Sequence, residues 1–86
     1  MKQSIYSIYD TVAQVFNKPF TDHNNATAIR SFTASIEGEK HKDDYALYLL
    51  AEYDDSNGSI KPVSDPVRIL SGLDIKTPEI LQQQVS

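Results

Sequence analysis

Two kinds of side chain in this sequence have the chemistry to bind single-stranded nucleic acid: tyrosines and basic residues. All five tyrosines lie in two strand-like stretches. Exposed tyrosine rings stack on unpaired bases when cations beside them contact the phosphates. We select Tyr6 and Tyr48 as candidates for stacking and Lys18 and Arg30 as candidates for phosphate contacts. The competing interpretation is that both tyrosines pack in a sheet and that Arg30 is a solvated helix residue.

The sequence contains no complete catalytic or metal-binding motif. Pairs of catalytic carboxylates stay open, but a chain of 86 residues seldom builds an enclosed pocket. His23 and His41 have no HxxxH or HxH partner, and a metal site needs about three protein ligands. The stretch DDSN (54–57) lacks the spacing of a calcium loop and is explained by turn chemistry. With three glycines and no GxSxG or GxxxxGK[ST] motif, a phosphate cradle or serine elbow is not expected. We therefore predict a protein without enzymatic activity, metal or cofactor.

Alternating apolar residues predict the strands that would position these side chains. QSIYSIY (3–9) is a strand with Ile5, Ser7 and Tyr9 on one face and Tyr6 and Ile8 on the other. DYALYLLAEY (44–53) is apolar on both faces, which predicts a central strand. In this stretch strict alternation places the odd-numbered residues from Tyr45 to Tyr53 on one face and Ala46, Tyr48, Leu50 and Glu52 on the other.

The segments that follow each strand are shorter and less regular. Residues 10–23 contain a short extended piece at Val12, Val15 and Phe16, and Pro19 fixes a turn or an edge position. The turn DDSNG, with Asn57-Gly58, predicts a hairpin whose second strand covers 59–63. Pro62 cannot donate a ladder hydrogen bond, so this strand is expected at an edge.

Helical signals occur twice. Residues 24–37 form the main helix, capped by Asn24 or Asn25, with an apolar stripe of Ile29, Phe32, Thr33 and Ile36 and with Gly38 just after it. Residues 64–75 contain a one-turn helix, with Ser64 or Asp65 as its cap and Pro66 at its first position.

The predicted fold class is α+β: a small antiparallel β-sheet of three or more strands with one main helix packed on a face, in β-α-β-β order. We expect a single domain over 1–75 and a polar C-terminal tail over 76–86 that is flexible or ordered by a partner. At 86 residues the core is thin, and a homodimer interface would add burial.

Bulk composition limits the location and the partners. The chain has no cysteine, no run of about 18 apolar residues and no apolar leader, which predicts a soluble intracellular protein without a membrane partner. The formal charge of −4 argues against a strong non-specific polyanion binder, since such proteins gain affinity by releasing counterions.

Three segments together resemble a known family. They are IYSIYDTVAQVFNKPF (5–20), TAIRSF (27–32) and KDDYALYLLAEYDDSNG (42–58). In this order, over about residues 3–75, the chain resembles the small nonstructural DNA-binding protein of gokushovirus-type microviruses, tailless bacteriophages with circular single-stranded DNA genomes. Ala51 departs from the glycine expected there, a change that affects local strand packing.

The resemblance implies a nonstructural phage protein of the host bacterial cytoplasm that binds single-stranded DNA and has no catalytic residues. Its implied role is in the switch from duplex replication to the synthesis or packaging of single strands. The alternative, favoured by the acidic charge, is a protein-protein interaction module. It would contact a replication, capsid or host protein through a sheet edge or through residues 76–86.

Overall fold

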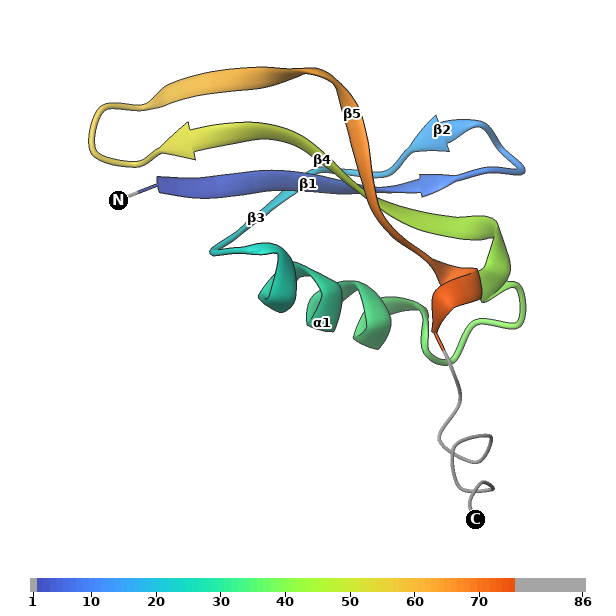
Figure 1. Cartoon of the computed structure of the whole chain (residues 1–86). Helices are drawn as coiled ribbons and strands as arrows, with labels where there is room; N and C mark the ends of the chain where they lie inside the picture. Colours follow the sequence, from blue (N-terminus) through green and yellow to red (C-terminus); the bar gives the residue numbers. More distant parts are fainter. Residues whose placement is uncertain (1, 76–86) are drawn as a thin grey trace.

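Five antiparallel strands and one helix make up residues 2–75, the part of the chain that this computed structural model describes (Figure 1). The strands are β1 (Lys2–Asp10), β2 (Val15–Phe16), β3 (Phe20–Asp22), β4 (Tyr45–Asp54) and β5 (Ser59–Ser71). The helix α1 covers Asn25–Ile36, and two single-turn 3₁₀ helices, η1 (Lys42–Asp44) and η2 (Gly72–Asp74), flank β4 and β5. The α+β prediction is confirmed, but the β-α-β-β order is not, because three strands precede the helix.

The sheet order is β2-β1-β4-β5, with β3 paired to β1 beside β2. β4 lies between β1 and β5, as its two apolar faces predict. β5 is the end strand, so the edge position expected for Pro62 is confirmed. The tail predicted over 76–86 lies outside the described residues.

The one-turn helix predicted within 64–75 is wrong over residues 64–71, which continue β5. Val67 and Arg68 pair with Leu49 and Tyr48, so the segment gains ladder hydrogen bonds that a single helical turn would forfeit. Residues 63–66 have no partner in the register and form an irregularity between Pro62 and Val67, so Pro66 lies where no ladder hydrogen bond to β4 is lost, and the pairing resumes at Val67. The 3₁₀ turn begins only at Gly72, where the Ser71 hydroxyl accepts from the backbone N–H of Leu73.

The helix begins where the sequence predicts. The Asn24 side chain accepts from the backbone N–H of Thr27 at 2.9 Å, and the Thr27 hydroxyl accepts from the Asn24 N–H, forming a capping box. Phe32 and Ile36 of the predicted stripe are buried, together with Ala28. They pack on Tyr6 and Leu47 of the sheet to form the core.

A bulge in β4 changes the faces that simple alternation predicts. Ile5 pairs with Ala51 and Tyr6 pairs with Leu49, so Leu50 is an extra residue in β4. Beyond it the alternation is inverted: Ala51 and Tyr53 share a face with Tyr48 rather than with Leu47 and Leu49. The predicted grouping of the odd-numbered residues from Tyr45 to Tyr53 is therefore wrong past Leu49.

Register divides the sheet into two faces, since residues paired across antiparallel strands point to the same side. We call the side that packs against α1 the helix face; its core residues are Tyr6 and Leu47. We call the opposite side the outer face. It carries, at paired positions, Gln3, Ile5, Ser7, Tyr9, Phe16, Thr21, Ala46, Tyr48, Ala51, Tyr53, Ile60, Pro62, Arg68 and Ser71. In Figure 1 α1 lies along one side of the sheet.

Within residues 2–75, no helix combines the length and the hydropathy that a membrane crossing requires.

Gly72 provides a test of the packing between η1 and η2. A Cβ at Gly72 would lie 1.8 Å from the carbonyl oxygen of Lys42, a backbone atom that cannot rotate away, whereas a Cβ at Gly38 meets nothing within 4 Å. We expect Gly72→Ala to lower the free energy of unfolding by about 3 kcal/mol or more. Gly38→Ala, the matched control, should leave it unchanged or raise it by about 0.5 kcal/mol. Urea unfolding of both variants measures this, and equal stabilities would contradict the close approach.

Asp22 provides a pH-dependent test of how β3 holds the helix. Its carboxylate accepts from the hydroxyls of Thr27 and Ser31, and these bonds, that from Thr27 foremost, hold its pKa below the usual value of 3.8. A lowered pKa in the folded state stabilises the fold above pH 3.8, and this stabilisation is lost as pH falls through the folded-state pKa.

We therefore expect Asp22→Ala to cost about 1 kcal/mol at neutral pH, a value discounted for partial exposure. The cost should shrink toward zero in acid below that pKa. Thermal unfolding across this pH range measures it, with the exposed Asp65→Ala as the control. A cost that does not vary with pH would show that the carboxylate charge has no part in the anchor.

Candidate nucleic-acid interface

Three aromatic rings from three strands meet on the outer face. The ring centroids of Tyr9 and Phe16 are 4.6 Å apart, and those of Phe16 and Tyr48 are 5.4 Å apart. Tyr9 and Tyr48 complete the group with centroids 5.7 Å apart at an interplanar angle of 72°. We call these residues the aromatic triad. Edge-to-face and tilted contacts of this kind fix the orientation of the rings.

A tight hairpin brings Phe16 to Tyr9. One carboxylate oxygen of Asp10 accepts from the backbone N–H groups of Val12 and Ala13, each at 3.0 Å. Gln14 adopts a left-handed conformation (φ 59°), and its N–H donates to the Asp10 carbonyl at 2.7 Å. The chain therefore reverses within four residues, and β2 returns with Phe16 opposite Tyr9.

The triad remains accessible to a ligand. Phe16 is 39% exposed, and Tyr9 and Tyr48 are partly exposed. Ser7, next to Tyr48 in the register, is fully buried, and its hydroxyl donates to the Asn17 carbonyl at 2.6 Å. The sheet beneath the rings is therefore closed to solvent, and all three rings are at least partly exposed.

Two cations are neighbours of the triad, one by its place in the sheet and one by its place in the sequence. Arg68 of β5 is paired with Tyr48, and opposite residues of an antiparallel pair have Cβ atoms about 4.5–5.5 Å apart. Lys18 is exposed and follows Asn17, two residues after Phe16. Arg68 and Lys18 are therefore the cations that we consider as phosphate contacts for a strand stacked on the triad.

Charge is divided unequally between the two faces of the sheet. Arg68 is the one charged side chain among the paired outer-face positions of the described strands. The paired acids, Asp10, Asp22, Glu52 and Asp54, all belong to the helix face. Tyr45 also belongs to the helix face. Burial raises the pKa of its hydroxyl, and the negative charges of Asp10, Glu39 and Asp44 raise it further. The net charge of −4 therefore says little about the outer face.

The outer face continues beyond the triad toward the β4–β5 turn. Tyr53 is partly exposed and pairs with Ile60, which is 58% exposed. Between this pair and the triad lie Ile5, Ala51 and Pro62, paired across three strands. Aromatic and aliphatic side chains therefore follow the long axis of the sheet.

The structure separates the four residues selected from the sequence. Tyr48 belongs to the triad, and Lys18 lies two residues after Phe16 in the sequence. Tyr6 is fully buried in the core, stacked on Phe20, and its hydroxyl donates to Asn25 Oδ1 at 2.6 Å. Its ring has no free face for a base, so the candidate role of Tyr6 is replaced by a structural one. Arg30 is exposed on α1, which covers the other face of the sheet.

Three residues of the site were not selected from the sequence. Strand alternation already placed Tyr9 on the face opposite to Tyr6, so its position was available as a signal. Phe16 joins the triad only through the Asp10 hairpin. Arg68 was hidden by the helix predicted around it, because a helical residue has no cross-strand partner.

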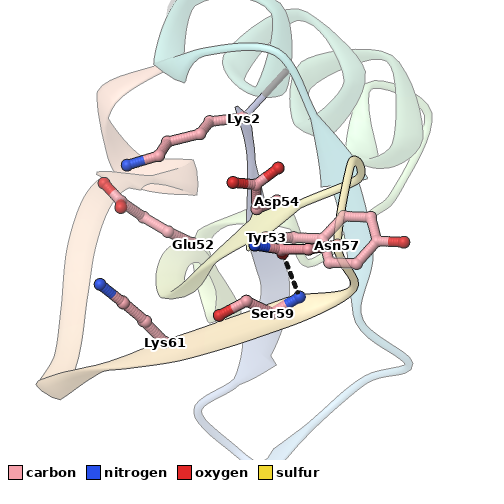
Figure 2. A pocket seen from close by; sticks show the side chains of 7 residues that line it. All are labelled: Lys2, Glu52, Tyr53, Asp54, Asn57, Ser59 and Lys61. Atoms are coloured by element: carbon pink, nitrogen blue, oxygen red, sulfur yellow. Dashed lines mark hydrogen bonds between the residues drawn. The ribbon is translucent and has the colours of Figure 1, made fainter.

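A small hollow lies at the other end of the sheet, beside the β4–β5 turn (Figure 2). Its volume is about 100 Å³, well below the roughly 300–1,000 Å³ of sites for organic ligands. Its polar groups hold the turn together. Asn57 Oδ1 accepts from the Ser59 N–H at 2.9 Å, and the Asp54 carboxylate accepts from the hydroxyl and N–H of Ser56, which lowers its pKa. Within residues 2–75, no three potential metal ligands gather at one place.

Comparison with known proteins gives one relationship. The family model described as "Phage ORF5 protein" matches residues 3–75, which include every strand and the helix described above except the first residue of β1. The comparisons with curated proteins and with solved structures give no match. Because the match spans most of the chain, the protein belongs to the Phage ORF5 protein family.

Proposed function

We propose that this phage protein binds single-stranded DNA without sequence specificity, through the aromatic triad and the cations beside it. The observation that carries the proposal is the position of Tyr9, Phe16 and Tyr48 on a sheet face whose paired positions hold no acid. Single-strand binders commonly combine stacking rings with cations that follow the backbone.

In the proposed mechanism, successive bases stack on the exposed surfaces of Phe16 and Tyr48. Arg68 and Lys18 contact the phosphates on either side. Every base has a π-face, so stacking holds the strand without distinguishing sequence. The work is binding alone, without a chemical step or a cofactor.

The biological role that fits this activity is nonstructural. Membership of a phage family and the resemblance to gokushovirus DNA-binding proteins support action in viral single-strand genome synthesis or packaging in the host bacterial cytoplasm. A homodimer would carry two triads and so bind a longer stretch of single-stranded DNA.

Substitutions on the two faces of the sheet test the site. We expect Phe16→Ala to weaken binding of a labelled single-stranded oligonucleotide by about 1–3 kcal/mol, roughly five- to 150-fold in Kd. Arg68→Ala should also weaken it. Arg30→Ala, a matched exposed arginine on the other side of the sheet, should bind within about twofold of the wild type. Fluorescence anisotropy at low salt measures all three.

Two results would contradict the proposal. If the wild-type protein binds no single strand even at low salt, the DNA function fails. If Arg30→Ala weakens binding as much as Arg68→Ala, the strand follows the helix and the outer face is not the site. Circular dichroism spectra of the variants establish that each is folded.

A protein-interaction module is the second candidate, and one observation favours it. β5 is the end strand of the described sheet and carries two exposed aliphatic residues, Ile60 and Val67, which is 46% exposed. A replication, capsid or host protein could add a strand there. Pro62 and Pro66 remove two backbone donors from β5, so we rank this function below DNA binding.

A further inference from the structure

We infer that the outer face holds its ligand chiefly by the bases, so that it selects unpaired bases over polyanionic backbone. This inference rests on the proposed function and specifies the chemistry of the same site. It concerns what the site recognises, and it makes the acidic composition of the chain compatible with nucleic-acid binding.

The first step is the number of cations that reach the site. Of the basic residues in the described part of the chain, Arg68 pairs with Tyr48 of the triad, and Lys18 follows Phe16 by two residues in the sequence. Lys2 and Lys61 belong to the helix face and line the hollow of Figure 2 together with Glu52 and Asp54. Lys40 and Lys42 lie in a segment shared with Glu39, Asp43 and Asp44. Within residues 2–75 we therefore count at most two phosphate contacts for the triad, from Arg68 and Lys18.

The second step is the surface available to bases. The triad presents three rings within 6 Å of one another, and Tyr53 and Ile60 extend the apolar surface along the sheet. A base that stacks there covers apolar surface without desolvating a carboxylate, because the paired acids face the other side. In a duplex the faces of the bases are already stacked on one another, so a duplex offers this surface only its backbone.

The third step converts two contacts into a salt dependence. For single strands the slope of log K against log salt is about −0.7 per phosphate neutralised. Two contacts give a slope of about −1.4, or roughly a sevenfold loss of affinity between about 50 and 200 mM salt. Proteins that bind through six to ten phosphates lose about 10³–10⁵-fold over the same range.

The experiment compares two strands that carry the same phosphates. Fluorescence anisotropy is recorded for the full chain with a labelled oligothymidylate of about 12 nucleotides and with an abasic strand of the same length. Each titration is repeated across the salt range. We expect the abasic strand to bind at least about tenfold more weakly, since about 1–3 kcal/mol per stacked base is removed. We also expect the oligothymidylate slope to stay near −1.4.

A variant and a competitor separate the contributions. Arg68→Ala should make the slope shallower by about 0.7 while the preference for the base-bearing strand persists. Heparin, a polyanion without bases, should displace the oligothymidylate poorly. Phe16→Ala should reduce the difference between the two strands and leave the slope unchanged.

The outcomes distinguish the inference from the proposed function. If both strands bind equally and both slopes are steep, the protein binds DNA by its phosphates; the inference is then overturned and the function stands. If neither strand binds at the lowest salt, the proposed function fails and the inference fails with it. If the oligothymidylate binds with a shallow slope and the abasic strand does not, the inference is supported.

Discussion

The pairing of β1 with β4 is the constraint on which the rest of this structure depends. In a strand the side chains alternate, so a shift of one residue would exchange the two faces. The observed register places Tyr6 and Leu47 under α1 and Tyr9 and Tyr48 on the outer face. The same register therefore places the core residues under α1 and the aromatic rings on the opposite face.

The bulge at Leu50 determines how far the outer face extends. Without it, Ala51 and Tyr53 would lie on the helix face and Glu52 would lie between Tyr48 and the β4–β5 turn. With it, the acids at 52 and 54 turn to the helix face and the apolar surface runs on to Tyr53 and Ile60. Ala51, at the position where the resemblance expects glycine, is the residue directly after the extra one, and it is buried.

The sequence was sufficient for β1, α1 and β4 and insufficient for the full length of β5 and for the irregularities of the sheet. Asn24, the stripe at Phe32 and Ile36, and the apolar run of β4 each carry a local signal, and each has the expected place. Pro66 after Ser64 and Asp65 gave a local helical signal, but tertiary pairing with β4 kept the segment extended. The bulge has no strong local signature, because Leu50 differs little from its neighbours.

The site was only partly predictable for the same reason. Tyr48 was selected for its residue type and lies in the aromatic triad. Tyr6 was selected although strand alternation placed it on the face opposite to Tyr9. Phe16 and Arg68 reach the site by a hairpin and by the last strand of the sheet, both of which depend on contacts distant in sequence. Distribution, rather than net charge, decides whether an acidic protein has a surface for DNA.

The most direct test of the outer-face account is a two-dimensional ¹H–¹⁵N NMR titration of the full chain with a short single-stranded oligonucleotide. The account predicts that the largest shifts occur at the backbone amides of Tyr9, Phe16, Tyr48 and Arg68, with little change along α1. Shifts concentrated on α1 around Arg30, with those four amides unchanged, would contradict it.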